Sequence, residues 1–278
     1  MRSIARRFFA LSPVTAAMSG ILLVTAATAP ISSHANHPRT KPTIVLVHGA
    51  FADSSSWSAI IPPLLAEGYP VVAAANPLRG VKDDADYVAG LIDSIEGPVI
   101  LVGHSYGGMV ISNAATGKSN VKALVYVSGF APDFGESALT LSVKFPGSTL
   151  SSALAPPVPL SDGTNDLYIQ QGKPFEEQFA PDVPASEAKL MAAIQRPGTD
   201  FGLNESAGAP AWKAIPSWFV YGALDKIIPA ALHAFMAERA HAKKTVPVRG
   251  ASHVVMISHP DAVLKVIGDA IMATCTSE

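Results

Sequence analysis

The stretch LVGHSYGGM, residues 101–109, decides how the rest of the chain is interpreted. An apolar run ends abruptly in a Gly-x-Ser-x-Gly turn, and the helical pattern YGGMVISNAA follows. Gly103 and Gly107 suit a sharp strand-to-helix turn, because a Cβ atom at either position would meet neighbouring backbone. Such a turn points the Ser105 hydroxyl out over a sheet and leaves backbone N–H groups free at the start of the helix. We therefore predict that Ser105 is a nucleophile and not a structural turn serine.

Apolar segments alternate with helical patterns along most of the chain. The spacing of apolar residues predicts helices over 86–95 and 261–272, and Pro229 is placed to begin another. Pro62 and Pro63 are expected to kink or split the helix that follows Ser54. The expected strands are nearly continuous apolar runs, as in strands buried on both faces: 43–49, 69–76, 98–104, 121–129, 217–222 and 244–250.

This alternation predicts an α/β fold, a mostly parallel sheet with helices on both faces. Ligands bind such sheets at the carboxyl ends of the strands. Residues 130–212 interrupt the pattern, since they contain many prolines and glycines, no convincing buried strand and one helical piece near 186–195. A plain loop of that length does not fit a compact domain. We predict a cap inserted over the strand ends.

The N-terminal segment has the composition of an export signal. Three arginines within the first seven residues precede an apolar run over 11–29, and a small residue at Ala35 fits a cleavage site. The pattern ARRFFA resembles a twin-arginine signal, with an ordinary secretory signal as the alternative. Polar and helix-breaking residues interrupt the apolar run, so we expect no stable membrane span. The predicted organisation is a signal peptide over 1–35, export to the periplasm or out of the cell, and one domain over 36–278 with its cap at about 130–212.

The composition limits the classes of partner and site that the chain can have. The chain has 278 residues, of which 49% are hydrophobic, enough for one large core. A net charge of -2 and scattered basic residues give no electrostatic footprint for nucleic acid, so we expect none as a partner. The single cysteine, Cys275, can form neither an intramolecular disulfide nor a thiolate zinc site.

A serine hydroxyl becomes a strong nucleophile only when a base takes its proton. Among the eight histidines, His253 follows the predicted strand 244–250, which is where a base is expected, although a loop histidine without a role is the alternative. His104 is expected to point away from its neighbour Ser105. His233 falls on a predicted helix and is expected to be solvated.

The base in turn needs an acid that fixes its tautomer. Asp225 follows the strand SWFVYG and precedes His253 in the chain. The resulting order, serine then aspartate then histidine, favours Asp225. The rival acid is Asp133, which follows the strand 121–129. A second alternative is that Asp225 caps the next helix.

Two backbone donors are expected to hold the developing oxyanion. One is the N–H of Tyr106, directly after the nucleophile, and the other comes from the loop HGAF after the first strand. Gly49 lets that loop approach closely. We expect Ala50 to supply the second N–H, with Phe51 as the alternative, and His48 to order the loop.

Four motifs together resemble the α/β-hydrolase superfamily: VLVHGAFADSSSW (45–57), VGHSYGGMV (102–110), YGALDKIIP (221–229) and GASHVVMISHP (250–260). They are similar to its small serine-esterase branch, which includes the plant methylesterases and hydroxynitrile lyases. The resemblance runs from Thr43 to Ala273 and is weakest across the cap. It implies the α/β-hydrolase fold, a triad of Ser105, Asp225 and His253, and an oxyanion hole of Ala50 and Tyr106.

Other branches fit less well. A serine nucleophile differs from the aspartate that haloalkane dehalogenases and epoxide hydrolases of this fold carry. In the hydroxynitrile lyases that these motifs resemble, a lysine directly follows the catalytic histidine, and a threonine takes the place of the His-Gly loop. The chain has Val254 and His48-Gly49 there, so cyanohydrin cleavage is not expected.

The expected function is hydrolysis of small apolar or aromatic carboxylic esters through an acyl-enzyme, with no metal or organic cofactor. The alternatives are amide, lactone or carbon–carbon bond hydrolysis, perhydrolysis, or a ligand-binding receptor on a hydrolase scaffold. Some apolar side chains of the cap are expected to line the site and the rest to pack the cap itself: Phe134, Leu139, Leu141, Phe145, Phe175, Phe179, Leu190, Met191 and Ile194.

Overall fold

A six-stranded parallel sheet lies at the centre of the structure, a computed structural model that describes residues 40–275. The strand order is β2-β1-β3-β4-β8-β9. Val47 pairs with Gly103, and His104 pairs with Val127, so the carboxyl ends of three central strands lie together. The strands are β1 (Thr43–Val47), β2 (Val71–Ala74), β3 (Val99–His104), β4 (Val121–Val127), β8 (Ser217–Gly222) and β9 (Lys244–Val248).

All six predicted strands are present, and the predicted α/β class is confirmed. β1, β3 and β8 are buried along their whole length, as their continuous apolar sequences indicate. β9 differs, because it is an edge strand in which exposed and half-buried residues alternate, so the predicted burial on both faces is wrong there. Its Pro247 is tolerated because an edge strand needs no hydrogen-bond donor on its open side.

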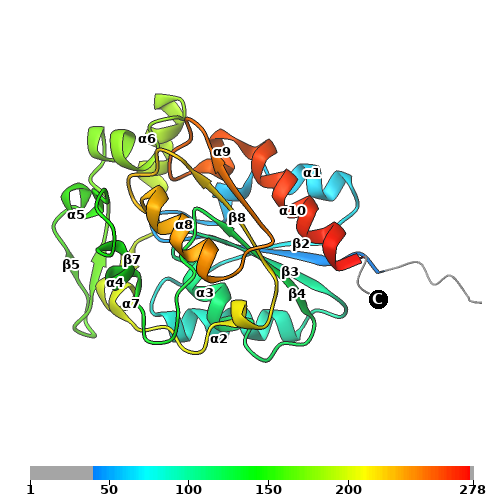
Figure 1. Cartoon of the computed structure of the whole chain (residues 1–278). Helices are drawn as coiled ribbons and strands as arrows, with labels where there is room; N and C mark the ends of the chain where they lie inside the picture. The colour runs from blue at the N-terminus through cyan, green and yellow to red at the C-terminus, as the bar shows by residue number, and fades with distance from the viewer. Residues whose placement is uncertain (1–39, 276–278) are drawn as a thin grey trace, which may run out of the picture. The chain divides into compact units, whose positions relative to one another are not determined.

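Helices cover both faces of the sheet (Figure 1). α1 (Ile61–Ala66) and α10 (Pro260–Cys275) lie on one face, while α2 (Val81–Asp93) and α3 (Gly107–Ala114) lie on the other. α8 (Ala230–Arg239) packs on β8 and β9. Two shorter helices complete this part of the chain, α9 (Val255–Ser258) and η3 (Ala211–Lys213).

The helix predicted after Ser54 is split into two, which is one of the two outcomes expected from the proline pair. Pro62 and Pro63 lie in the first turn of α1 and do not kink a longer helix. The first turn accepts proline because its N–H groups have no partner inside the helix. A separate 3-10 helix, η1 (Ser54–Trp57), precedes α1.

The segment predicted as a cap lies at the carboxyl ends of the strands (Figure 1). It holds a small antiparallel sheet, which the sequence did not reveal because each strand has only two or three residues. The expected helix near 186–195 is α6. The elements are α4 (Ala138–Ser142), α5 (Leu150–Ala153), β5 (Val158–Pro159), β6 (Asn165–Leu167), the π-helix η2 (Phe175–Phe179), α6 (Ala185–Ile194), β7 (Gly198–Thr199) and α7 (Asp200–Asn204).

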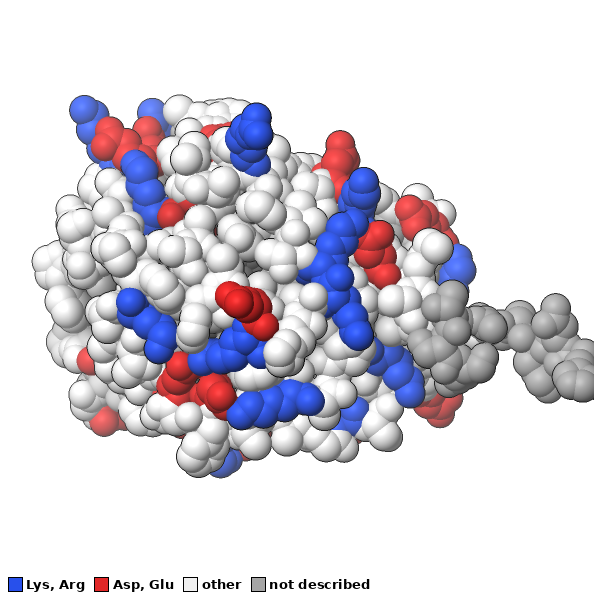
Figure 2. Space-filling model, in the orientation of Figure 1, with Lys and Arg blue, Asp and Glu red and all other residues white. Residues whose placement is uncertain are grey.

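The predicted signal peptide over 1–35 lies outside the described residues, so export and that boundary stay predictions. Within residues 40–275, no helix has the length and apolar character needed to cross a membrane. On the face drawn in Figure 2, basic and acidic side chains are interspersed.

Candidate active site

Ser105 occupies the sharp turn between β3 and α3. Its φ angle is +52°, in the left-handed region that residues other than glycine seldom adopt. A Cβ atom on Gly107 would lie 2.4 Å from the carbonyl oxygen of Val47, so only glycine fits there. The Ser105 carbonyl accepts hydrogen bonds from the N–H groups of Gly108 (2.9 Å) and Phe130 (3.0 Å). These two hydrogen bonds hold the strained backbone of Ser105 in place at the carboxyl end of β3, where the sequence predicts the nucleophile.

Asp225 and His253 form a fully buried pair. The Nδ1 atom of His253 lies 2.7 Å from Oδ2 of Asp225, and both side chains are shielded from solvent. A carboxylate only accepts hydrogen bonds, so Nδ1 carries the hydrogen and Nε2 is left as the acceptor. Nε2 is buried and has no hydrogen-bond partner within residues 40–275, Ser105 included. The histidine is thus oriented with a free basic nitrogen.

The other oxygen of Asp225 faces backbone. Oδ1 accepts hydrogen bonds from the N–H groups of Ile227 (2.8 Å) and Ile228 (2.9 Å). The residue preceding α8 is Pro229, so Asp225 orders the loop before the helix and does not cap it. Burial would raise the pKa of Asp225, but the charge of His253 and the hydrogen bonds from His233 and His253 outweigh it and hold that pKa well below its usual value. Asp225 is therefore an anion across the physiological range.

The loop after β1 brings a backbone donor next to the serine. A Cβ atom on Gly49 would lie 2.6 Å from Cβ of Ser105, so the two loops are in direct contact. The N–H of Phe51 donates to the carbonyl of Arg196 (2.8 Å), which removes Phe51 as an oxyanion donor. The N–H groups of Ala50 and Tyr106 donate to no group in the described part of the chain. Both residues chosen from the sequence are thus free to bind an oxyanion.

The side chain of Tyr106 has a buried partner on α2. Its hydroxyl donates to Oδ2 of Asp84 at 3.0 Å. Burial raises the pKa of Asp84 and that of Tyr106, with the Asp84 carboxyl adding to the effect on the tyrosine. This contact joins Tyr106, the residue predicted to supply an oxyanion-binding N–H, to α2.

Two further histidines lie at this site, and the position of one of them, His233, differs from the expectation. His233 was expected to be solvated, but it is fully buried and its Nε2 lies 3.2 Å from Oδ2 of Asp225. Leu232, Met236 and Ala237 are buried on the same helix, and this apolar spacing was the available signal that position 233 faces inward. The Nε2 atom of His104 lies 3.2 Å from the carbonyl of His253, and the two ring centroids are 4.8 Å apart.

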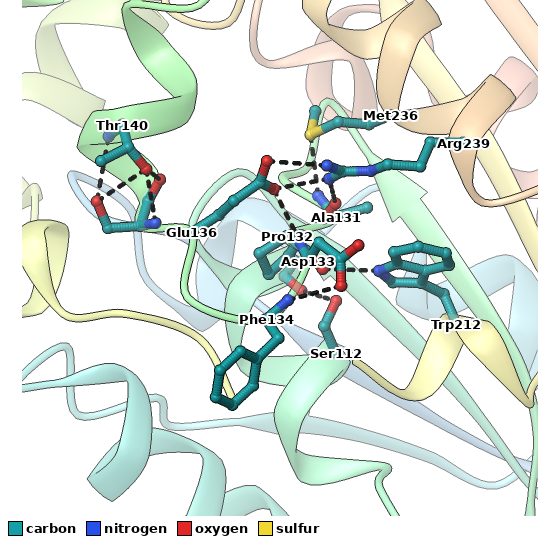
Figure 3. Close-up of polar contacts among 12 residues, drawn as sticks. Ser112, Ala131, Pro132, Asp133, Phe134, Glu136, Thr140, Trp212, Met236 and Arg239 are labelled. Atoms are coloured by element: carbon teal, nitrogen blue, oxygen red, sulfur yellow. Dashed lines mark hydrogen bonds and ion pairs between the residues drawn. The ribbon is translucent and has the colours of Figure 1, made fainter. Parts of the chain in front are cut away.

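Asp133, the alternative acid, bonds to other groups (Figure 3). Asp133 pairs with Lys213, 2.5 Å from its Nζ, and its backbone N–H donates to Glu136. The hydrogen bond from Lys213 lowers the pKa of Asp133. Among the described residues, none of its hydrogen bonds or ion pairs reaches His253, so the structure brings only Asp225 to the base.

Cap residues reach the loop that carries His253. The carboxylate of Asp182 accepts hydrogen bonds from the backbone N–H (2.8 Å) and the hydroxyl of Ser252. The ring of Phe179, the last residue of η2, packs edge-on against His253 with centroids 5.2 Å apart. The cap therefore contacts both His253 and the residue before it, Ser252.

An apolar cavity of about 390 Å³ lies within the cap segment and is lined only by its residues, from Phe130 to Asn204. Leu139 and Phe145 are among them, while Leu141, Phe175 and Phe179 are buried in the core. A second cavity of about 510 Å³ is lined by Leu190, Met191 and Ile194, and Phe134 is exposed. Within residues 40–275, no group of three or more metal-binding side chains is assembled.

Comparison with known proteins shows the family to which the chain belongs. The sequence profile of the Alpha/beta hydrolase family matches residues 44–266. The chain is 25% identical over 248 residues to an alpha-hydroxynitrile lyase of Arabidopsis thaliana, an alignment that covers 79% of this chain and 93% of that protein. It is 25% identical over 245 residues to a pimeloyl-[acyl-carrier protein] methyl ester esterase of Neisseria meningitidis H44/76, with 81% and 91% covered. Methylesterase 8 of Arabidopsis thaliana is 23% identical over 243 residues, with 79% and 86% covered.

A solved structure shares the fold. Polyneuridine aldehyde esterase superposes with a TM-score of 0.71 at 21% identity, covering 83% of this chain and 99% of that one. The predicted resemblance to this superfamily, and to its methylesterase and hydroxynitrile lyase branch, is confirmed.

Proposed function

Because this chain belongs to the α/β-hydrolase family, we propose that it is a serine carboxylic-ester hydrolase whose catalytic triad is Ser105, His253 and Asp225. The buried Asp225–His253 pair, 2.7 Å apart, with its second imidazole nitrogen free, carries the proposal. The esterase names of two relatives support the reaction class.

In the first half of the reaction, Nε2 of His253 takes the hydroxyl proton of Ser105 while Oγ attacks the ester carbonyl. Asp225 holds the imidazole in the tautomer with hydrogen on Nδ1 and stabilises the imidazolium that forms. The N–H groups of Ala50 and Tyr106 bind the oxyanion, and one such donor typically lowers the barrier by about 2.7–4 kcal/mol. The barrier is lowered because these dipoles are fixed before charge develops.

The first half ends when the protonated His253 gives its proton to the leaving alkoxide oxygen, the alcohol departs, and an acyl group remains on Ser105. A water molecule then loses a proton to His253 and attacks the acyl carbonyl. Collapse of this second intermediate releases the carboxylic acid and restores the serine. Apart from the ester and this water molecule, each step uses side chains and backbone of this chain.

The apolar cavity within the cap segment supports an apolar or aromatic acyl group as substrate. Phe130 lines it, and the N–H of Phe130 binds the Ser105 carbonyl directly. Leu203 lines both this cavity and the narrow gap beside Ala50 and Tyr106. The cavity and the gap beside the two proposed oxyanion donors therefore share Leu203, and the cavity volume of about 390 Å³ suits a small molecule.

The test is a panel of p-nitrophenyl esters of increasing chain length, run on the wild-type protein and on Ser105→Ala. We expect turnover of apolar esters by the wild type and its loss in the variant; equal rates would refute the nucleophile assignment. A cyanohydrin is included because one relative is named a lyase. Amides, lactones and peracid formation extend the panel to the other triad reactions, and tight binding of a small apolar ligand without turnover would favour a receptor.

A further inference from the structure

The carboxylate of Asp225 has two imidazole partners where the proposed mechanism uses one. Its Oδ2 atom is 2.7 Å from Nδ1 of His253 and 3.2 Å from Nε2 of His233. All three side chains are fully buried. The proposed mechanism assigns His233 no task, although the side chain meets the same oxygen as the base.

The surroundings of His233 fix its protonation state. Its Nε2 carries a hydrogen, because the carboxylate of Asp225 can only accept. Its Nδ1 is buried and has no partner within the described residues, so a second proton there would be a buried donor without an acceptor. The ring stacks on Tyr221, with centroids 4.7 Å apart and planes at 18°. Burial lowers the pKa of His233, in agreement with a neutral imidazole of one fixed tautomer.

We propose that His233 is a positioning residue of the triad, whose Nε2–H shares Oδ2 of Asp225 with His253 and so tunes how strongly the carboxylate holds the protonated base. The inference rests on the proposed triad. A carboxylate oxygen that already accepts one hydrogen bond stabilises a neighbouring imidazolium less than a free one does. With His233 in place, His253 therefore remains the neutral base to lower pH.

Apart from Asp225, the groups in direct contact with the two imidazole rings are uncharged. Tyr221 from β8 packs on His233, and burial raises the pKa of that tyrosine. His104 from β3 contacts His253, and burial places its pKa well below the usual value. From the cap, Phe179 contacts His253, while the charged Asp182 binds the adjacent Ser252. Asp225 is thus the charged group in direct contact with both rings.

The experiment measures kcat/KM against pH for p-nitrophenyl butyrate with the wild-type protein, His233→Leu and His233→Gln. Leucine removes the donor, whereas the glutamine amide places an N–H near the position of Nε2. The acid limb of this profile reports protonation of the free enzyme's base. We expect it to move upward by roughly 0.5–1 pH unit in His233→Leu and to stay at the wild-type position in His233→Gln.

Two outcomes overturn the proposal: an unmoved acid limb in His233→Leu, or an equal displacement in His233→Gln. A merely structural histidine would lower kcat or stability in both variants without moving the limb. If His233→Leu does not fold, His233→Asn replaces it, because its shorter amide cannot reach Asp225, and the same upward shift is expected. Ser105→Ala is measured alongside: activity that survives there refutes the triad itself, whereas its loss together with an unmoved limb refutes only the role of His233.

Discussion

At the scale of single residues, the turn around Ser105 requires a glycine at position 107. A Cβ atom on Gly107 would lie 2.4 Å from the Val47 carbonyl oxygen, which belongs to a central strand and cannot move aside. We expect Gly107→Ala to lower the free energy of unfolding in urea by about 1–3 kcal/mol. Gly90→Ala is the matched control, because nothing lies within 4 Å of its Cβ position on exposed helix surface. There we expect about 0.5–1 kcal/mol of stabilisation, and a Gly107→Ala protein as stable as wild type would contradict the geometry.

The two candidate acids also differ at this scale. Asp225→Asn replaces an anion that accepts hydrogen bonds from His253 and His233 by a neutral amide with a donor group. We expect kcat for a p-nitrophenyl ester to fall by about 10⁴, since the histidine loses its tautomer and its counter-charge. Asp133→Asn removes only a surface pair with Lys213 and should leave kcat within about twofold. The reverse ranking would make Asp133 the acid.

At the scale of elements, the cap and the loop that carries the base are joined through one carboxylate. Asp182 accepts two hydrogen bonds from Ser252, the residue before His253, and the adjoining π-helix packs Phe179 on the imidazole. Asp182→Ala should lower kcat/KM by about tenfold or more, because each hydrogen bond to a charged group contributes roughly 1.5–3 kcal/mol. The far-ultraviolet circular dichroism spectrum should not change.

Asp162→Ala is the control for this prediction. Asp162 is an exposed acidic residue of the same segment whose side chain bonds only to Thr164 in its own turn, among the described contacts. Its substitution should leave kcat/KM close to the wild-type value. Equal losses of kcat/KM in both variants would mean that the cap tolerates no change of charge. The contact of Asp182 with Ser252 would then not explain the loss.

At the scale of the whole molecule, buried neutral histidines predict how stability depends on pH. Burial lowers the pKa values of His48, His104 and His233, so the unfolded chain binds protons more readily than the native one. The free energy of unfolding should therefore fall as the pH drops below about 6.5, by up to about 1.4 kcal/mol per pH unit for each histidine. Burial raises the pKa of Asp84, so this one carboxyl group opposes the trend.

Urea unfolding at pH 7.5 and pH 5.5 measures this difference. His233→Gln carries one titrating group fewer and should show a smaller loss of stability between the two pH values. A wild-type protein that is equally stable or more stable at pH 5.5 would contradict the burial of these histidines as neutral groups.

The sequence revealed the parts of this molecule that depend on local pattern. Buried strands are continuous apolar runs, and Ser105 and Asp225 each follow one of them, while His253 follows the edge strand β9. The parallel sheet brings the carboxyl ends of these strands to one edge. Contacts between distant segments have no such signal. Tyr106 bonds to Asp84 across 22 positions, and Ser252 to Asp182 across 70. The burial of His233 was detectable from the apolar face of α8, but its bond to Asp225 required the fold.

The central claim is that Ser105 is the nucleophile, and covalent labelling tests it most directly. The protein is incubated with diethyl p-nitrophenyl phosphate, and the modified residue is located by mass spectrometry of its peptides. The account predicts one diethyl phosphate group per chain, on Ser105, with ester hydrolysis lost in proportion to labelling and no adduct on Ser105→Ala. A label on another residue, or full hydrolysis by protein labelled at Ser105, would contradict it.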